Sequence, residues 1–301
     1  MRNAMSIDVE DWYHPEALRG VVRPEDWGHL EPRAMRNVDK LLRLLDLAQV
    51  RATFFMLGWI AERQPELVRR IAAEGHEIGS HGYAHEMITQ QTPERFASDL
   101  RQSLRVLRSQ SGQRVVGYRA PSFSVVRDTL WALDILIDHG IEYDSSIFPV
   151  HHDRYGIPGS PRAPYRVRWG GGRELWELPP VTLRLGGRTL PAAGGGYLRL
   201  LPYAYSALAL RRANAEGFPG VVYTHPWEYD PEQPHVRLPF LRALRHYSRI
   251  ATTEAKLARL LREFRFTTCL EVLDAVRNRP QELQVPAQTP APEPVHVREG
   301  A

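Results

Sequence analysis

Ala4-Met-Ser-Ile-Asp-Val-Glu-Asp11 opens the chain with an apolar run that ends in a cluster of carboxylates. The apolar part is typical of a buried strand, so the carboxylates are expected at the carboxyl end of that strand. Enzymes built on parallel sheets place their chemistry at this end of the sheet. The stretch therefore predicts an α/β fold whose functional site lies where the first strand ends.

Strand and helix patterns alternate along the rest of the chain. Apolar residues at helical spacing occupy 35–45, and 52–56 is typical of a buried strand. A capping threonine and a first-turn proline open a predicted helix at 92–111. Further buried strands are expected at 115–119 and 220–224. This alternation favours a parallel sheet, and a closed or partly closed barrel is preferred because no glycine-rich phosphate turn follows the first strand.

The domain organisation is predicted to be simple. Residues 1–277 are expected to form one domain, whose C-terminal part runs from about 150 to 277. Glycine, proline and arginine dominate 150–172, which predicts a long irregular excursion that lines the site. Residues 278–301 hold several prolines and few large apolar groups, so a disordered tail is expected there.

Composition excludes several protein classes. Of the 301 residues, 43% are hydrophobic and 25% are charged, which is typical of a globular protein and excludes disordered and fibrous chains. No run approaches the roughly 18 apolar residues of a spanning helix, and the start does not read as a signal segment, so a soluble cytoplasmic protein is expected. Cys269 is the only cysteine, so any metal must be held by histidine and carboxylate.

The basic character of the chain does not indicate a nucleic-acid partner. The formal net charge is +4, but lysine occurs only at Lys40 and Lys256, and the arginines are scattered along predicted helical faces. Nucleic-acid binding needs a concentrated basic patch, and no basic run with interleaved aromatic residues is present. We therefore expect no nucleic-acid partner.

His81-Gly-Tyr-Ala-His85 follows another predicted strand and suggests a metal site. The two imidazoles can converge on one ion if His81 ends the strand and His85 lies on the turn that follows. The spacing alone is a weak signal, since such a pair is often a surface or capping feature. The signal gains weight from further polar residues at predicted strand ends, which are Asp8, Glu10, Asp11, Arg119 and His225.

Each of these residues also has a structural interpretation. Asp8 and Asp11 could cap the loop that follows them, although no helix signal appears for many residues. Arg119 could be a solvated arginine paired with any acid. His225, taken alone, is more typical of a structural histidine held by a carbonyl.

Five sequence blocks occur in the order found in a known family. They resemble the blocks of the polysaccharide deacetylases, also called NodB-homology or carbohydrate esterase family 4 enzymes, from Ile7 to about Glu228. The first and last blocks look like the subgroup associated with exopolysaccharide loci of exosortase (PEP-CTERM) bacteria. The blocks are Asp8-Val-Glu-Asp-Trp-Tyr-His14, His81-Gly-Tyr-Ala-His85, Tyr118-Arg-Ala-Pro-Ser122, Tyr143-Asp-Ser-Ser146 and Tyr223-Thr-His-Pro-Trp-Glu228.

The resemblance implies a fold and an activity. The fold would be a distorted (β/α) barrel with roughly seven parallel strands. The activity would be removal of acetyl groups from N-acetylated sugars with a divalent metal, usually Zn²⁺. Matched position by position, the catalytic base would be Asp8, the imidazole ligands His81 and His85, the arginine that orients the base Arg119, and the general acid His225.

The carboxylate ligand is the point at which this sequence departs from the family pattern. The family usually has two adjacent aspartates, the second being the ligand, whereas this chain has Asp8-Val-Glu-Asp11. Strand alternation places Glu10 on the face of Asp8, and Asp11 lies one residue further into the loop. Ligand type slightly favours Asp11, and Glu10 is a nearly equal candidate.

Substrate contacts are predicted beside these groups. Trp12, Tyr83 and Trp227 are candidate sugar-stacking platforms, although aromatic residues next to strands are more often core. Pro121 and Ser122 are further candidates, and an amide near 118–122 or at Tyr83 could hold an oxyanion. The expected partner is an N-acetylated glycan, with peripheral contact to inner-membrane polysaccharide machinery as a further expectation. Two alternatives are a cyclic amide (allantoinase-like) hydrolase and a catalytically silent carbohydrate-binding relative.

Overall fold

The first strand of the chain, β1 (Asn3–Val9), lies within a curled and mostly parallel sheet. A computed structural model describes residues 1–152, 154–168, 172–192, 194–279 and 285–288. The main path of the sheet runs β10-β1-β2-β3-β4-β5-β7-β6-β12, and β11 pairs with β1. Seven consecutive strands, β10 to β7 along this path, are mutually parallel, which confirms the predicted fold class.

The remaining strands of the main sheet are β2 (Thr53–Met56), β3 (Glu77–Ser80), β4 (Gly117–Tyr118), β5 (Tyr143–Asp144), β6 (Tyr165–Arg168), β7 (Glu174–Glu177), β10 (Val221–Thr224), β11 (Phe266–Thr267) and β12 (Val285–Gln288). A separate antiparallel hairpin consists of β8 (Thr182–Leu185) and β9 (Arg188–Pro191). The helices are α1 (Ala34–Leu47), α2 (Gly58–Arg63), α3 (Pro65–Ala73), α4 (Pro93–Ser111), α5 (Trp131–Asp138), α6 (Gly196–Leu200), α7 (Tyr203–Ala215), α8 (Phe240–Tyr247), α9 (Thr253–Glu263) and α10 (Cys269–Arg277).

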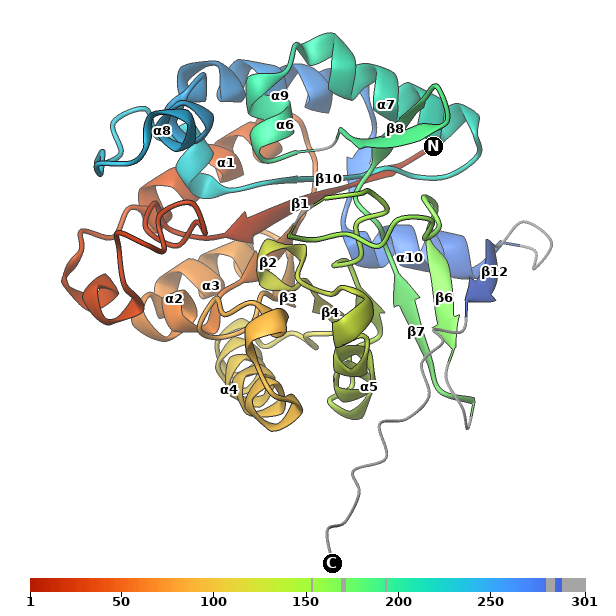
Figure 1. The fold of residues 1–301 in the computed structure, drawn as a ribbon, viewed down its shortest axis with the longest axis horizontal. Coiled ribbons are helices and arrows are strands. Elements are labelled where there is room, and N and C mark those ends of the chain that lie inside the picture. The colour runs from red at the N-terminus through yellow and green to blue at the C-terminus, as the bar shows by residue number, and fades with distance from the viewer. Residues whose placement is uncertain (153, 169–171, 193, 280–284, 289–301) are drawn as a thin grey trace, which may run out of the picture.

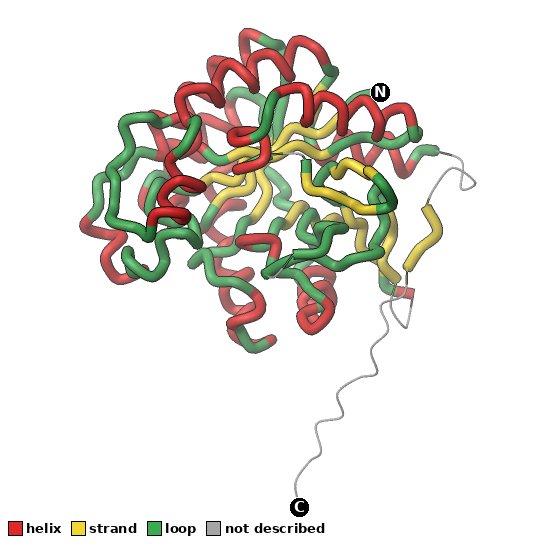
Figure 2. Tube along the Cα trace, turned by 45° about the horizontal axis from the view of Figure 1, so that its top comes forward, coloured by secondary structure: helices red, strands yellow, loops and turns green. Residues whose placement is uncertain are grey.

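Strands occupy the middle of the molecule and helices surround them (Figure 2). Beyond β7 the chain makes two isolated parallel bridges back to β10, from Pro180 to Val221 and from Gly194 to Tyr223, so the curled sheet returns towards its first edge. Among the described helices, none combines the length and the apolar composition that crossing a bilayer requires.

Successive side chains of β1 point to opposite faces of the strand, one set into the apolar core and the other towards the polar groups of the site. Met5, Ile7 and Val9 are fully buried in the main apolar core together with residues of the covering helices. Ser6 and Asp8 lie on the other face, where both contact the side chain of Arg119. Because side chains of a strand alternate with a period of two, the next residue on this inner face is Glu10.

Local sequence explains the helix boundaries that the patterns predicted. Thr92 caps α4 with its hydroxyl, which accepts a hydrogen bond from the Arg95 amide, and Pro93 occupies the first turn. Gly112 ends the helix in the left-handed region, at φ 66°, a conformation that glycine adopts without strain.

Two predictions for the C-terminal half differ from the structure. The excursion at 150–172 contains strand β6, which pairs antiparallel with β7 and alternates between buried and more exposed residues. The predicted disordered tail at 278–301 falls largely outside the described residues. Its described segment Val285–Gln288 is strand β12, which pairs with β6.

Candidate functional site

A cavity of about 180 Å³ lies at the carboxyl ends of strands β1, β3 and β10. Turns that follow these strands supply most of its polar groups, as expected for a parallel α/β sheet. Its walls combine carboxylates, imidazoles and aromatic rings. The lining residues are Asp8, Glu10, Pro15, Glu16, His81, His85, Met87, Ser122, Phe123, Arg154, Tyr155, Tyr223, His225 and Trp227.

Glu10, His81 and His85 converge in this cavity and are all buried. The Glu10 Oε1 atom lies 3.0 Å from His85 Nε2 and 3.4 Å from His81 Nε2. His81 directly follows β3, and His85 reaches the same point because its backbone adopts φ 51°, in the left-handed region. Such backbone strain in a non-glycine residue is typical of functional sites.

This donor set fits a divalent metal ion. Zinc bonds of about 2.0–2.1 Å in a tetrahedral arrangement place neighbouring ligand atoms roughly 3.3 Å apart, close to the separations found here. His81 Nδ1 lies 2.8 Å from the Arg119 carbonyl oxygen, so it donates its proton there and leaves the Nε2 lone pair free. Burial alone would raise the pKa of Glu10, but His85, His225 and His81 hold that pKa well below its usual value. The charged carboxylate is the form that a metal requires.

Asp11 does not belong to this cluster, and the preference for Asp11 as the carboxylate ligand was wrong. Its Oδ2 atom accepts hydrogen bonds from the amides of Arg33, at 2.8 Å, and Ala34, at 2.9 Å, where α1 begins. Its Oδ1 atom accepts from the Trp12 amide at 2.8 Å. Asp11 therefore caps the N-terminus of α1, a position that favours a carboxylate.

Asp8 and Arg119 form a buried ion pair beside the cluster. Arg119 Nη1 lies 2.7 Å from Asp8 Oδ1 and 2.7 Å from Ser6 Oγ. The other guanidinium nitrogens of Arg119 donate to the carbonyl and the hydroxyl of Ser145, at 3.1 and 2.8 Å. Arg119 is fully buried, so its orientation is fixed by these bonds. Asp8 keeps its Oδ2 atom on the side of His225, whose Nε2 lies 3.9 Å away.

His225 is held by a second buried ion pair. Its Nδ1 atom lies 3.1 Å from Glu228 Oε2, and Glu228 Oε1 in turn accepts from Arg199 Nε at 3.1 Å. Burial alone would lower the pKa of His225, but the carboxylates of Glu10, Glu228 and Asp8 raise it to about 9. His225 can therefore carry a proton into the cavity on Nε2 while Nδ1 is fixed by Glu228.

The predicted substrate residues divide into two groups. Ser122 and Trp227 line the cavity, and the Trp227 ring stacks on His225 at a centroid distance of 5.4 Å. Pro121 and Trp12 are buried outside the lining, and the Trp12 indole donates to the Glu31 carbonyl. The structure therefore does not place these two predicted substrate residues at the cavity wall.

Tyr83 also turns away from the cavity, against prediction. Its hydroxyl donates to Glu62 at 2.6 Å, and its amide donates to Asp99 at 2.7 Å. That amide is therefore engaged and cannot serve as an oxyanion donor. Ser122 and Phe123 line the cavity and have positive φ values of 56° and 54°. Of the two predicted places for an oxyanion donor, the strained backbone is therefore found at the 118–122 segment and its neighbour, not at Tyr83.

Glu228, which holds His225, and several residues of the cavity lining carried no role in the sequence interpretation. Glu228 closed the fifth sequence block, and a carboxylate three residues after a histidine was the available signal. Tyr223 opened the same block at the end of β10. Arg154 and Tyr155 come from the irregular segment at 150–172, whose predicted place at the site is confirmed. Their individual roles depend on loop geometry that no local pattern specifies.

A pair of buried carboxyl groups lies behind the Arg119 side of the site. Asp144 on β5 and Glu177 on β7 are register neighbours and hydrogen bond to each other. Both are fully buried, and neither Asp144 Oδ2 nor Glu177 Oε2 has a donor from another group. Burial and the mutual repulsion of the two groups raise the pKa of Glu177 well above its usual value, and burial raises that of Asp144 to about 6. The geometry is that of a carboxyl and a carboxylate sharing one proton.

This pair predicts a pH dependence of stability. Both pKa values are raised above the ordinary 3.8 and 4.5, so the stability contributed by the protonated pair is fully present below those values and is lost as the pH rises through about 6. Glu177→Gln supplies a permanent donor to Asp144. The variant should therefore lose less unfolding free energy than the parent protein between about pH 4 and pH 7.

Urea unfolding at a series of pH values measures this difference. Asp46→Asn, which removes an exposed carboxylate on α1, is the matched control and should leave the slope of stability against pH unchanged. Parallel pH profiles for the parent and Glu177→Gln would exclude the shared proton.

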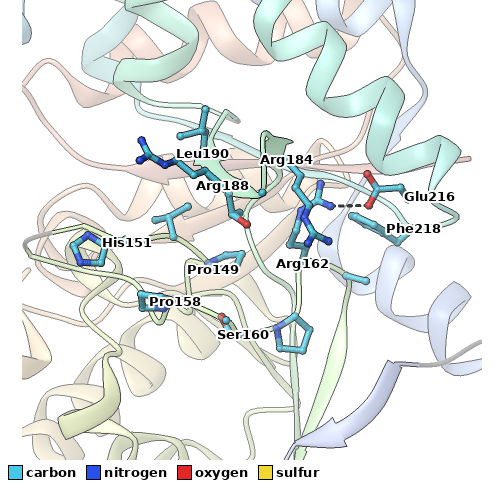
Figure 3. Close-up of a pocket in the computed structure, with 16 residues that line it drawn as sticks. Pro149, His151, Pro158, Ser160, Arg162, Arg184, Arg188, Leu190, Glu216 and Phe218 are labelled. Carbon is cyan, nitrogen blue, oxygen red and sulfur yellow. Dashed lines mark hydrogen bonds and ion pairs between the residues drawn. The ribbon is translucent and has the colours of Figure 1, made fainter.

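A larger cavity of about 950 Å³ lies between the 149–163 segment and the β8–β9 hairpin (Figure 3). Its walls carry Arg162, Arg184 and Arg188, and Arg162 pairs with Glu216 at 2.6 Å. Among the described residues that line it, no carboxylates and histidines gather as they do around Glu10. Cavity volume therefore does not identify the candidate functional site. The smaller cavity is the candidate, because the carboxylates and imidazoles gather there.

Comparison with known proteins identifies two matched segments. Residues 30–143 match the family described as polysaccharide deacetylase, and residues 145–274 match a domain of unknown function (DUF3473). A peptidoglycan deacetylase from Helicobacter pylori is 31% identical over 136 residues, which are 44% of this chain and 41% of that protein. The chain thus spans about two fifths of the length of that relative.

Solved structures share the fold over most of their length. A crystal structure of a candidate polysaccharide deacetylase from Mycobacterium smegmatis superposes with a TM-score of 0.61 at 22% identity and covers 97% of this chain and 95% of its own. The structure of Puue allantoinase superposes with a TM-score of 0.54 at 16% identity and covers 90% of each chain. At these identities the likeness concerns the fold alone.

Proposed function

Because residues 30–143 match the family described as polysaccharide deacetylase, we propose that this chain is a hydrolase that removes N-acetyl groups from amino sugars of a polysaccharide or its precursor. One observation carries the proposal. A carboxylate with two imidazoles, a carboxylate held by a buried arginine, and a histidine held by a buried glutamate all face one cavity. Amide hydrolysis needs an electrophilic centre, a base and an acid at such a point.

The proposed metal ligands are Glu10, His81 and His85. A divalent metal such as zinc would polarise the acetamide carbonyl and lower the pKa of water towards about 7 when bound. Asp8 would accept the proton of the attacking water, since Arg119 binds its other oxygen and orients it. Ser122 lies at the wall where a backbone amide can face the developing oxyanion.

His225 would protonate the departing nitrogen. Glu228 fixes the His225 ring through Nδ1, so Nε2 is the atom that faces the cavity. Burial alone would raise the pKa of Glu228, but His225 and Arg199 lower it, so Glu228 stays ionised. The base and the acid therefore approach the cavity from β1 and from the turn after β10, at 3.9 Å from one another.

A glycan substrate is supported by the shape of the surroundings. A groove of about 860 Å³ continues from the cavity and shares with it Pro15, Arg154, Tyr155, Tyr223 and Trp227. Aromatic rings beside a groove are suited to stacking on sugar faces. The Helicobacter pylori relative is named for peptidoglycan, an N-acetylated glycan. We propose exopolysaccharide biosynthesis as the setting from the sequence blocks, with a cytoplasmic location that stays a prediction.

Chelation tests the mechanism. Treatment with EDTA should abolish acetate release from chitooligosaccharides and from peptidoglycan fragments, and added zinc should restore it, because the electrophilic centre depends on the ion. The measurement is enzymatic detection of free acetate together with metal analysis of the purified protein. Release that continues unchanged in protein shown to be metal-free would contradict the proposal.

Two alternatives are separated by the same assays. The shared fold of Puue allantoinase makes cyclic ureides the second substrate to test, and ring opening without acetate release would favour that activity. A silent carbohydrate-binding relative would bind chitooligosaccharides but release no acetate. The presence of Asp8 and His225 in one cavity, with Arg119 paired to Asp8 behind its wall, argues against this alternative, since binding alone does not require all three.

A further inference from the structure

Helix α8 presents large apolar side chains to solvent. Phe240, Leu241 and Leu244 are 77%, 76% and 52% exposed. Among the described residues only five other large hydrophobic side chains are exposed, and they lie on other elements. At 100° per residue, the three side chains form one continuous stripe along α8. Figure 1 shows α8 at the periphery of the molecule.

The stripe is surrounded by unpaired positive charge. The segment 233–253 contains no aspartate or glutamate but has exposed arginines before, within and after α8. Within the described part of the chain, none of these guanidinium groups takes part in an ion pair. The arginines are Arg237, Arg242, Arg245 and Arg249.

The opposite face of α8 is anchored to the protein. His246 is buried and stacks on Trp227 at a centroid distance of 4.7 Å. Arg199 Nη1 and Nη2 donate to the carbonyls of Ser248 and Arg245, at 2.6 and 3.0 Å, and so bind the end of the helix. The apolar stripe is thus held outward by a fixed inner face and cannot be buried by a simple rotation of the helix.

We propose that the part of this face that lies outside the groove, made of Phe240 and Leu244 with Arg237 and Arg249 beside them, contacts an anionic lipid surface, while Leu241, Arg242 and Arg245 border the groove. A short helix with phenylalanine and leucine on one side and basic residues beside them is the pattern of an interfacial helix. Apolar groups enter the headgroup boundary, and the arginines gain from the negative surface potential of the membrane. Charge complementarity selects this partner, because a neutral apolar partner would leave the guanidinium groups without counter-charges.

Vesicle binding by the full chain tests the proposal. The probe is co-sedimentation with vesicles of equimolar phosphatidylglycerol and phosphatidylcholine, compared with vesicles of phosphatidylcholine alone. The parent protein should bind the anionic vesicles, and raising the salt concentration should weaken that binding. Arg237→Gln with Arg249→Gln should weaken it roughly 30-fold, since each basic residue near the surface contributes about fivefold.

The apolar stripe is tested separately, with variants outside the groove walls. Phe240→Ser with Leu244→Ser should weaken binding by at least about tenfold. The matched control is Leu47→Ser with Leu208→Ser, which alters exposed leucines on α1 and α7 and should bind as the parent does. Unchanged unfolding midpoints establish that all variants fold.

Three outcomes overturn the proposal. The first is no binding to anionic vesicles by the folded parent, and the second is equal binding by the parent and both α8 variants. The third is concentration-dependent dimerisation, seen by sedimentation equilibrium, that Phe240→Ser with Leu244→Ser abolishes while vesicles bind nothing. That result would assign the face to a second copy of the chain. None of these measurements depends on the proposed deacetylase activity.

Discussion

Replacing Glu10 by glutamine is expected to remove the bound metal and the activity together. Glu10 is the carboxylate whose Oε1 lies 3.0 and 3.4 Å from the two imidazole nitrogens, and an amide cannot supply its charge. Zinc affinity should fall by more than roughly 100-fold, because removing a group that only hydrogen bonds to a metal ligand already lowers metal affinity 10- to 100-fold. Acetate release should fall by on the order of 1,000-fold. Equilibrium dialysis with zinc and the acetate assay measure the two effects.

Asp11→Asn is the matched control, one residue away. Asp11 accepts hydrogen bonds from two backbone amides at the start of α1 and from the Trp12 amide, and asparagine cannot accept all three. This variant should lose about 1–3 kcal/mol of unfolding free energy but keep its zinc stoichiometry. If Asp11→Asn lost zinc at an unchanged unfolding midpoint while Glu10→Gln kept it, the ligand set would be wrong.

Replacing Asp8 by asparagine should abolish turnover while the metal site persists. Asparagine cannot accept the proton of water, and removal of a general base typically costs 10²- to 10⁴-fold, so acetate release is expected to fall by about that factor. The variant keeps Glu10, His81 and His85, so zinc should bind with the parent stoichiometry.

Stability provides a second measure of the Asp8 variant. Arg119 is fully buried and would lose the one carboxylate that pairs with it among the described residues, so the unfolding free energy should fall by about 3–5 kcal/mol. Ser145→Ala removes one hydrogen bond to the same guanidinium and should destabilise the protein by about 1 kcal/mol with little loss of turnover. Turnover of Asp8→Asn within a few-fold of the parent would reject Asp8 as the base.

The patterns predicted most of the fold because the main elements have strong local periodicity. β1 and α4 illustrate this, one as an apolar run and the other as a capped amphipathic segment. Short α2 was not predicted, because tertiary contact selects it. A Cβ atom on Gly58, its first residue, would lie 2.6 Å from the Tyr83 ring, so close packing specifies that turn. β6 was hidden among glycines and prolines, although its residues alternate.

The site was predictable where a residue stands at a strand end, as Asp8, His81 and His225 do. The sequence could not decide whether Glu10 or Asp11 is the carboxylate ligand, because the position of Asp11 depends on where α1 begins. The amides that Asp11 caps belong to residues 22 and 23 positions further along the chain. The direction of Tyr83 likewise depends on distant carboxylates, so sequence spacing alone could not establish it.

The guanidinium group of Arg199 connects α8, at the periphery of the molecule, to His225, the proposed proton donor. Arg199 binds the terminal carbonyls of α8 with two nitrogens and Glu228 with the third, and Glu228 holds His225. An outward shift of α8 must either strip Arg199 of buried partners, at about 1–3 kcal/mol for each, or draw it away from Glu228. The position of α8 and the position of His225 are therefore coupled through Arg199. Displacement of α8 by the proposed lipid contact would therefore alter the position of His225, the proposed acid.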